Sequence, residues 1–310
     1  MKSIALPSTF GLLLCLHATP AHAIPESWVA SNGGGVACSR AQPCAGFQVA
    51  HNATDPGGII KCVDAGSFAG ATISKSITID CTGTNGGSVN AVSNAFTVDG
   101  ADVVLTLRGL SIDGLGTGNA GVRFVDGSAL HIQNCRISGS TQAGILFARN
   151  AAGTAKLHVS DSVISNNGNG ILINASGSGT VRGMLTRVQV ENNSLGGIIA
   201  SSSIGPGTVV VQVRDSIVAS NTGHGIFAST PGGPTVLTAF VVDRSSSLLN
   251  SGDGIRAQGP TAVVHLGNST VIGNGGGLIA LEGGQILSYQ NNQASGNGVD
   301  GAPTGVLTVK

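Results

Sequence analysis

Acidic side chains are the first group that could do chemistry. The tripeptides Val98-Asp99-Gly100 and Val125-Asp126-Gly127 match each other, and Asp102 lies close to the first of them. Carboxylate oxygens are ligands that Ca²⁺ prefers, although the ion usually takes six or more oxygens. An Asp-Gly pair after a strand is also an ordinary turn. We therefore expect turn residues here, with a Ca²⁺ site at Asp99, Asp102 and Asp126 as the alternative.

Two histidines are the second group. His131 and His158 lie at the centres of the apolar runs Leu130-His131-Ile132 and Leu157-His158-Val159. On neighbouring strands, two imidazoles could bind a metal ion or respond to pH. The same outward column is expected to hold His265 further along, and also residues of unrelated types, namely Thr106, Met184, Gln212, Phe240 and Ser288. The sequence therefore favours a solvent-exposed face.

A repeat positions these groups. Glycine followed by an aliphatic residue recurs seven times, at spacings of 23, 26, 27, 28, 29 and 23 residues. The glycines are Gly121, Gly144, Gly170, Gly197, Gly225, Gly254 and Gly277. A period of this size is typical of a solenoid, in which each repeat packs only against its neighbours.

Each repeat contains three short β-type runs and no helical period. Alternation places every second residue inside, and these positions are almost all aliphatic or Ala. Identical turn residues on rungs about 4.8 Å apart can form hydrogen-bonded ladders. One polar column is Asn134, Asp161, Asp215, Asp243, Asn268 and Asn291, and another is Asn167, Asn193, Asn221, Asn250, Asn274 and Asn297.

The segments outside the repeats predict an exported chain. Residues 1–23 have the form of a signal peptide, with Lys2, an apolar run and the cleavage site Ala21-His22-Ala23. Residues 24–58 form the expected N-terminal cap, in which Ala41 to Ala53 is a weakly amphipathic helix that covers the open end. Residues 59–301 are the solenoid, and 302–310 are a tail or a capping strand. We expect a secreted or periplasmic location.

Composition excludes several partners. Lys plus Arg equals Asp plus Glu at 15 each, so no overall field attracts nucleic acid. Beyond the signal, no segment is long and apolar enough to span a membrane. The hydrophobic content of 41% argues against a disordered chain.

Five cysteines follow the signal peptide, and an oxidising compartment favours their pairing. Cys38 and Cys44 flank a short loop, and Cys62 and Cys81 end successive strands, so we expect these two bridges. Cys135 is left over at an inward position, which predicts a buried, unreactive thiol.

These features resemble the right-handed parallel β-helix of the pectin-lyase-like superfamily over roughly residues 57–301. The resemblance rests on short strands, asparagine ladders and turns such as Asn167-Gly168-Asn169-Gly170-Ile171. The stretch with Pro43-Cys44 and Gly57-Gly58 is similar to a secreted bacterial group within it. The resemblance implies an all-β, single-stranded, right-handed parallel β-helix. It selects no function, because the superfamily includes lyases, hydrolases, epimerases, adhesins and inert scaffolds.

The resemblance also suggests where catalytic residues would lie. Gly223-His224-Gly225 is similar to an element of polygalacturonase-like hydrolases, but the aspartate motifs that accompany it there are absent. A turn role for His224 is therefore the better interpretation. Pectate-lyase-like enzymes combine Ca²⁺-binding carboxylates with an arginine base, for which Asp99, Asp126 and Arg123 are the nearest candidates.

A further outward column is apolar. It consists of Leu146, Leu172, Ile199, Phe227 and Ile279, interrupted by Arg123 and Arg256. Exposed strips of this kind mark partner surfaces or are covered by the chain itself. We weigh intrachain cover and self-association equally.

The sequence thus predicts an exported, non-catalytic scaffold that binds a polysaccharide or another cell-surface component. One alternative is a polysaccharide lyase or glycoside hydrolase with an unrecognised site. The other is an adhesive or structural rod that self-associates through the apolar column. No cofactor is expected apart from the Ca²⁺ alternative.

Overall fold

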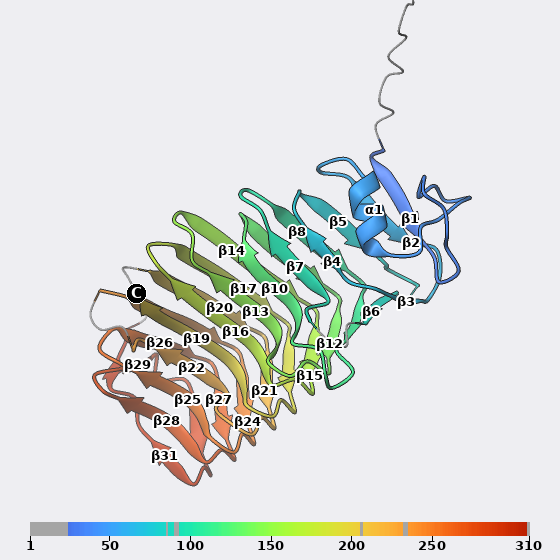
Figure 1. Ribbon diagram of the computed structural model, residues 1–310. Helices are drawn as coiled ribbons and strands as arrows, with labels where there is room; N and C mark the ends of the chain where they lie inside the picture. Colours follow the sequence, from blue (N-terminus) through green and yellow to red (C-terminus); the bar gives the residue numbers. More distant parts are fainter. Residues whose placement is uncertain (1–23, 85, 90–92, 205–206, 232–234, 309–310) are drawn as a thin grey trace, which may run out of the picture.

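The chain winds as a parallel β-helix (Figure 1). The computed structural model describes residues 24–84, 86–89, 93–204, 207–231 and 235–308, so the predicted signal peptide lies outside the described residues. Successive strands fall into three sheets, here named A, B and C, with one strand of each per coil. The predicted all-β solenoid with three strands per coil is therefore confirmed.

The strands of the three sheets pair in parallel, each with the strand one coil away. Sheet A contains β1 (Glu26–Val29), β2 (Ile59–Cys62), β5 (Ile77–Asp80), β8 (Val104–Arg108), β11 (Ala129–Gln133), β14 (Thr154–Ser160), β17 (Thr180–Thr186), β20 (Thr208–Arg214), β23 (Leu237–Asp243), β26 (Ala262–Gly267), β29 (Gln285–Ser288) and β32 (Gly305–Val306). Sheet B contains β3 (Ser67–Phe68), β6 (Gly87–Val89), β9 (Ser111–Asp113), β12 (Arg136–Ser138), β15 (Val163–Ser165), β18 (Gln189–Glu191), β21 (Ile217–Ala219), β24 (Ser246–Leu248), β27 (Thr270–Ile272) and β30 (Gln293–Ser295). Sheet C contains β4 (Ala71–Ile73), β7 (Phe96–Asp99), β10 (Ala120–Asp126), β13 (Ala143–Arg149), β16 (Asn169–Ser176), β19 (Gly196–Ile204), β22 (Ile226–Ser229), β25 (Asp253–Gln258), β28 (Gly276–Leu281) and β31 (Val299–Gly301).

Columns of stacked aliphatic side chains fill the interior. Ile145, Ile171, Ile198 and Ile226 pair from rung to rung in sheet C, and each is almost completely buried. The repeat glycine before each isoleucine has no room for a side chain. At Gly170, an added Cβ would collide with the side chain of Val190 from sheet B of the next coil. The Gly-aliphatic repeat is therefore a packing requirement of the stacked coils.

The N-terminal end of the stack is covered by helix α1 (Phe47–Ala53) (Figure 1). The ring of Phe47 packs against those of Phe68 and Phe96, with centroids 5.1 and 5.4 Å away. The helix is shorter than the predicted Ala41 to Ala53, because Cys44 instead forms a β-bridge with Val29. No helix in the described ranges is long and apolar enough to cross a membrane.

Both predicted disulfides are present, Cys38–Cys44 and Cys62–Cys81. Cys135 is free and buried, as expected. Burial is the main cause that raises the pKa of its thiol to about 11, so the thiol stays protonated and unreactive at neutral pH.

A buried asparagine ladder joins sheet B to sheet C. The side-chain Nδ2 of Asn221 donates to Oδ1 of Asn250 at 2.9 Å and to the carbonyl of Val190 at 3.2 Å. Its own Oδ1 accepts from the backbone N and Nδ2 of Asn193. The same pattern runs through the predicted column Asn167, Asn193, Asn221, Asn250, Asn274 and Asn297. Asp300 accepts the last two donors, from Asn297.

The other polar column differs from the prediction at two coils. Asn134, Asp161 and Asp215 have positive φ angles near 50°, but the equivalent residue of the next coil is Arg244 (φ 47°). Asp243 instead ends strand β23, paired with Arg214. In the coil after Asn268, the equivalent residue is Gln290 (φ 64°) instead of Asn291. The predicted column was therefore shifted by one residue at both Asp243 and Asn291.

We expect the substitution Asn221→Ala to destabilise the fold by about 3 kcal/mol, because it leaves buried donors of Asn193 without acceptors. The urea midpoint measures the loss. Thr222→Ala, at the exposed neighbouring position, should cost less than about 0.5 kcal/mol. Equal midpoints for the two variants would contradict a structural role of the ladder.

Candidate functional site

The acidic residues lie at the end of sheet C. Asp99 and Asp126 pair across β7 and β10, as the matching tripeptides predicted. One carboxylate oxygen of Asp126 accepts from the backbone N of Gly127 and lies 3.7 Å from Nε of Arg149. Asp102 accepts a 3.4 Å hydrogen bond from the hydroxyl of Ser128.

Asp102, Asp126 and Arg149 line a hollow of about 290 Å³. Arg149 is buried and donates to the carbonyls of Ala151, Ala152 and Gly153, so it holds the turn before β14. The described residues contain no group of three or more His, Cys, Asp or Glu side chains that could hold a metal ion. A Ca²⁺ site at Asp99, Asp102 and Asp126 stays a prediction.

Arg123 lies on the outer face of sheet C, in register with Thr97 and Leu146. Its Nε is buried and has no hydrogen-bond partner in the part of the chain that the structure describes. No ion pair between the described residues joins Arg123 to Asp126. A role as the base of a lyase therefore stays a prediction.

His224 lies at the start of β22, in the turn position that the sequence predicted. Its Nδ1 accepts from the backbone N of Asp253 at 2.9 Å, and its Nε2 lies 3.4 Å from the guanidinium of Arg256. Burial lowers the pKa of His224, the Arg256 guanidinium also lowers it, and the Asp253 carboxylate opposes them. Arg256 pairs with Asp253 at 3.0 Å and lies over the ring of Phe227. The sequence named these residues only as members of separate columns, and the coil stacking joins them.

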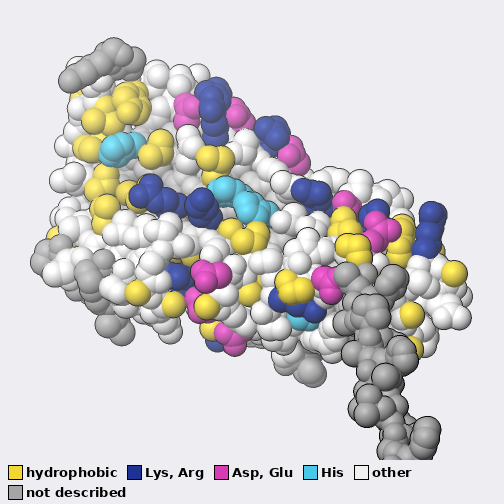
Figure 2. Space-filling view, turned by 90° about the horizontal axis from the view of Figure 1, so that it is seen from above, with side chains coloured by type: hydrophobic (Ala, Val, Ile, Leu, Met, Phe, Trp, Pro, Cys, Tyr) yellow, Lys and Arg dark blue, Asp and Glu magenta, His cyan; other side chains and the backbone are white. Residues whose placement is uncertain are grey.

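The outer face of sheet A carries a basic group, here called the cationic patch: Arg108, His131, Lys156, His158 and Arg182. His131 pairs with His158, and Lys156 pairs with Arg182 on the next rung. The two imidazole rings are 4.8 Å apart at their centroids, edge to face. Figure 2 looks onto this face, where histidine and basic side chains gather near the centre.

No ion pair between the described residues neutralises the cationic patch, although Asp80 of β5 is in register with Arg108. Strands β8, β11, β14 and β17 contain no Asp or Glu. Lys156 and Arg182 are exposed, and no ion pair within the described ranges includes them. Arg108 donates from Nε to the neutral side chain of Gln133. Alternation along the strands places Lys156 and Arg182 on the same outward face as the histidines, but in the sequence alone they look like ordinary exposed residues.

The turn column beside this face shows the opposite arrangement. Arg187 donates to both carboxylate oxygens of Asp161, and Arg244 does the same to Asp215. These hydrogen bonds lower the pKa of both aspartates. Charges on this column therefore alternate in sign from coil to coil, whereas the cationic patch holds one sign only.

The histidine column was predicted with the wrong residue at two coils. Gln212 pairs with Val241, so Phe240 is the buried neighbour of Val211. His265 pairs with Leu287, and Ser288 is buried. The far end of the column is therefore more apolar than predicted.

The apolar column of sheet C is in register as predicted, running through Leu146, Leu172, Ile199, Phe227 and Ile279. Leu146 is only 3% exposed and packs with Ala120 and Ala143, while the other four are half-buried. Contact with a partner through this column stays a prediction.

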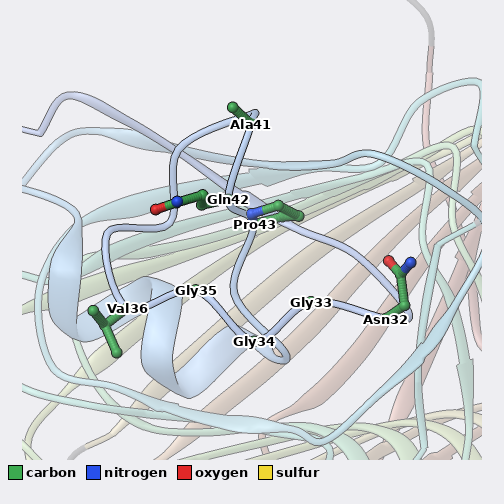
Figure 3. A pocket seen from close by; sticks show the side chains of 8 residues that line it. All are labelled: Asn32, Gly33, Gly34, Gly35, Val36, Ala41, Gln42 and Pro43. Atoms are coloured by element: carbon green, nitrogen blue, oxygen red, sulfur yellow. The ribbon is translucent and has the colours of Figure 1, made fainter.

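A hollow of about 650 Å³ lies among loops of the N-terminal cap. Glycines 33–35 form much of its wall, and Asn32, Val36 and Gln42 point in different directions (Figure 3). It has no charged or aromatic side chain in its lining, so no convergent set of groups selects a ligand.

The histidine pair predicts a pH dependence of stability. Burial first, and then neighbouring positive charges, lower the pKa of His131 and His158. The unfolded chain then binds more protons below its usual value of about 6.5, so stability is lost as pH falls through the lowered pKa. The double variant His131→Gln, His158→Gln should lose less stability between about pH 7 and pH 5, measured by urea midpoints. A loss equal to that of the wild type would contradict this.

Self-association through the apolar column predicts that Leu172→Ser combined with Ile199→Ser changes solubility or the mass seen by light scattering. Asn174→Ser, on the same face of β16, is the control that should change neither. If the double variant also changes neither, the column is not a contact surface.

Comparison with known proteins supports the fold. The family model described as "Right handed beta helix region" matches residues 94–238. Among solved structures, the pectate lyase Pel9A has a TM-score of 0.60 at 16% identity, over 87% of this chain and 78% of that chain. The Azotobacter vinelandii mannuronan C-5 epimerase AlgE4 A-module has a TM-score of 0.42 at 11% identity, over 82% of this chain and 91% of that one. A mutant of the periplasmic alginate epimerase AlgG has a TM-score of 0.41 at 13% identity, over 81% of this chain and 74% of that one.

No curated protein matches the sequence significantly. At these identities the solved structures show the fold alone. The predicted resemblance is confirmed at that level: the chain is a right-handed parallel β-helix, and its residues 94–238 match the family of right-handed β-helix regions.

Proposed function

We propose that this protein is an exported, non-catalytic scaffold that binds an anionic polysaccharide along the outer face of sheet A. The observation that carries the proposal is the unneutralised cationic patch. Lys156 and Arg182 stack on adjacent rungs without a carboxylate, in a chain whose formal net charge is zero. Like charges directly opposite each other destabilise a sheet, so this arrangement has a cost that a bound anion would remove.

The size of this cost supports a ligand site. Two unit charges about 5 Å apart repel by roughly 1 kcal/mol in water, and His131 and His158 add charge when they are protonated. The neighbouring turn column avoids the same cost by pairing Arg187 with Asp161. The fold can therefore neutralise an outward arginine with a carboxylate of the neighbouring coil. Lys156 and Arg182 lack such an ion pair among the described residues, and a ligand with repeated anionic groups would explain this difference.

A polysaccharide fits the shape of this face better than a small anion does. The patch extends over β8, β11, β14 and β17, which lie in successive coils. Lys156 and Arg182 are in register on coils about 4.8 Å apart, and Arg108 is level with Ser160, four positions farther along the strand. The cations are thus spread over the face instead of converging on one point, as an extended ligand requires. The similarity to a structure named as a pectate lyase agrees with this class of ligand.

The same geometry supports a binding role without catalysis. Asp126 is hydrogen-bonded to Gly127 and lies beside Arg149, and His224 is held by Asp253. His224 lies beside the outer face of sheet C, whereas Asp102 and Asp126 lie in the turns that lead into sheet A. There the hydroxyl of Ser128 donates to Asp102, and the carbonyl of Ser128 accepts from the backbone N of Lys156. Two disulfides support export, because such bonds persist in oxidising compartments.

We expect polygalacturonate to bind the wild type and the double variant Lys156→Gln, Arg182→Gln to bind it about tenfold more weakly, since each exposed charge contributes up to about 1 kcal/mol. Added salt should weaken the wild-type complex. Isothermal titration calorimetry measures both effects.

The matched control is Arg187→Gln with Arg244→Gln, which removes the same net charge from the ion-paired column. It should bind as the wild type does. Equal losses in the two double variants would contradict a site at the cationic patch. Cleavage of polygalacturonate by the wild type, with or without Ca²⁺, would contradict the non-catalytic role and favour the lyase alternative at Asp99, Asp126 and Arg123.

A further inference from the structure

Another hollow lies on the outer face of sheet A, on the C-terminal side of the cationic patch. Its volume is about 440 Å³, and its lining residues come from four coils and the C-terminal tail. They are Gln212, Val241, Val242, Asp243, Gly267, Asn268, Tyr289, Asn291 and Thr308. We call this hollow the Tyr289 cavity.

One wall of the Tyr289 cavity is apolar. Tyr289 is the only tyrosine of the chain, and its ring lies over Gly267, where an added Cβ would come within 3.1 Å of the ring. The glycine therefore lets the ring lie close to the sheet. Val241 lines the same cavity and is half-buried, and His265 and then Leu287 follow it in the outward column. A sugar ring packs its C–H face on surfaces of this kind.

The rim is polar and uncharged overall. Asn268 donates to Asp243 at 2.9 Å, and Asn291 donates to Asn268 at 2.9 Å. Among the described residues, each of these two amides uses one N–H in these bonds, which leaves the other for a ligand hydroxyl. Gln212 forms no side-chain hydrogen bond within the described residues, so its amide is also available.

Charge separates this cavity from the cationic patch. Its one carboxylate, Asp243, is neutralised by Arg244 at 2.8 Å and lies 3.7 Å from Arg214. A uronate would meet that carboxylate, whereas a neutral sugar would use it as a hydrogen-bond acceptor. The chemistry of the cavity thus favours an uncharged sugar residue.

We infer that the Tyr289 cavity is a subsite for a neutral sugar, so that the ligand of this face is a heteropolysaccharide with both acidic and neutral residues. This inference rests on the proposed function for the acidic part of the ligand. Strand β17 of the patch is two rungs from β23 and four from β29, or about 10 to 19 Å at one strand spacing per rung. A single extended chain of a few sugars spans both sites.

The test uses the single tyrosine as a probe. Protein labelled with ¹³C-tyrosine is titrated with cellohexaose, mannohexaose, xylohexaose and galactohexaose, and the ring signals of Tyr289 are followed by NMR. At least one neutral oligosaccharide should shift these signals. Affinity for that oligosaccharide, measured by calorimetry, should fall about tenfold in Tyr289→Ala and stay within about twofold in Tyr289→Phe.

Two further variants keep the outcomes apart. Gln212→Ala leaves the ring in place and should weaken neutral-sugar binding, so a folding defect of Tyr289→Ala does not decide the result. Lys156→Gln with Arg182→Gln should retain neutral-sugar binding while losing polygalacturonate. If no oligosaccharide shifts the tyrosine signals, or if Tyr289→Ala and Gln212→Ala bind it unchanged, the subsite is wrong. The variant Lys156→Gln with Arg182→Gln could instead bind polygalacturonate as the wild type does, while Tyr289→Ala and Gln212→Ala lose the neutral oligosaccharide. In that case the proposed function fails and the subsite stands.

Discussion

In-register stacking of parallel coils is the constraint on which this structure depends. Each strand pairs with the strand one coil away, so that within the glycine repeat residues 23 to 29 positions apart become direct neighbours. The asparagine ladder fixes that register, because a coil shifted by one residue would leave several buried donors and acceptors unpaired at once. The columns of buried aliphatic side chains cannot fix the register alone, since one isoleucine packs on another with little directional preference.

The same constraint acts on the surface. A side chain that faces outward lies directly against its equivalents in the coils on either side, so like charges at one repeat position repel. On the turn column the chain alternates Asp161, Arg187, Asp215 and Arg244, and the repulsion becomes a row of ion pairs. On sheet A it does not, and this contrast within one molecule separates structural charge from charge available to a ligand. The Tyr289 cavity extends the same face with chemistry of another kind.

Most of the fold could be predicted from the sequence because the repeat is strongly patterned. The glycine period, the asparagine column and the two cysteine pairs each have one physical explanation, and each prediction is confirmed. The errors share a cause. In β23, Phe240 and Val241 are both apolar, so alternation alone does not show which of them faces inward, and a slip of one residue misplaced Phe240 and Asp243 together.

The candidate site was harder to predict for a related reason. His131 and His158 stand out as polar residues within apolar runs, but Lys156 and Arg182 look like ordinary exposed residues until their strands are paired. Their lack of carboxylate neighbours is a property of four coils taken together. The cluster of His224, Asp253 and Arg256 is likewise formed by residues of two coils, and a motif of three residues could not reveal it.

The most direct test of the central claim is a crystal structure of the protein with trigalacturonate. We expect sugar rings lying lengthwise on sheet A across β11, β14 and β17, with ligand carboxylates in hydrogen-bond contact with Lys156 and Arg182. Ligand bound instead at Asp126 and Arg149, or on sheet C beside His224, with the outer face of sheet A bare, would contradict it.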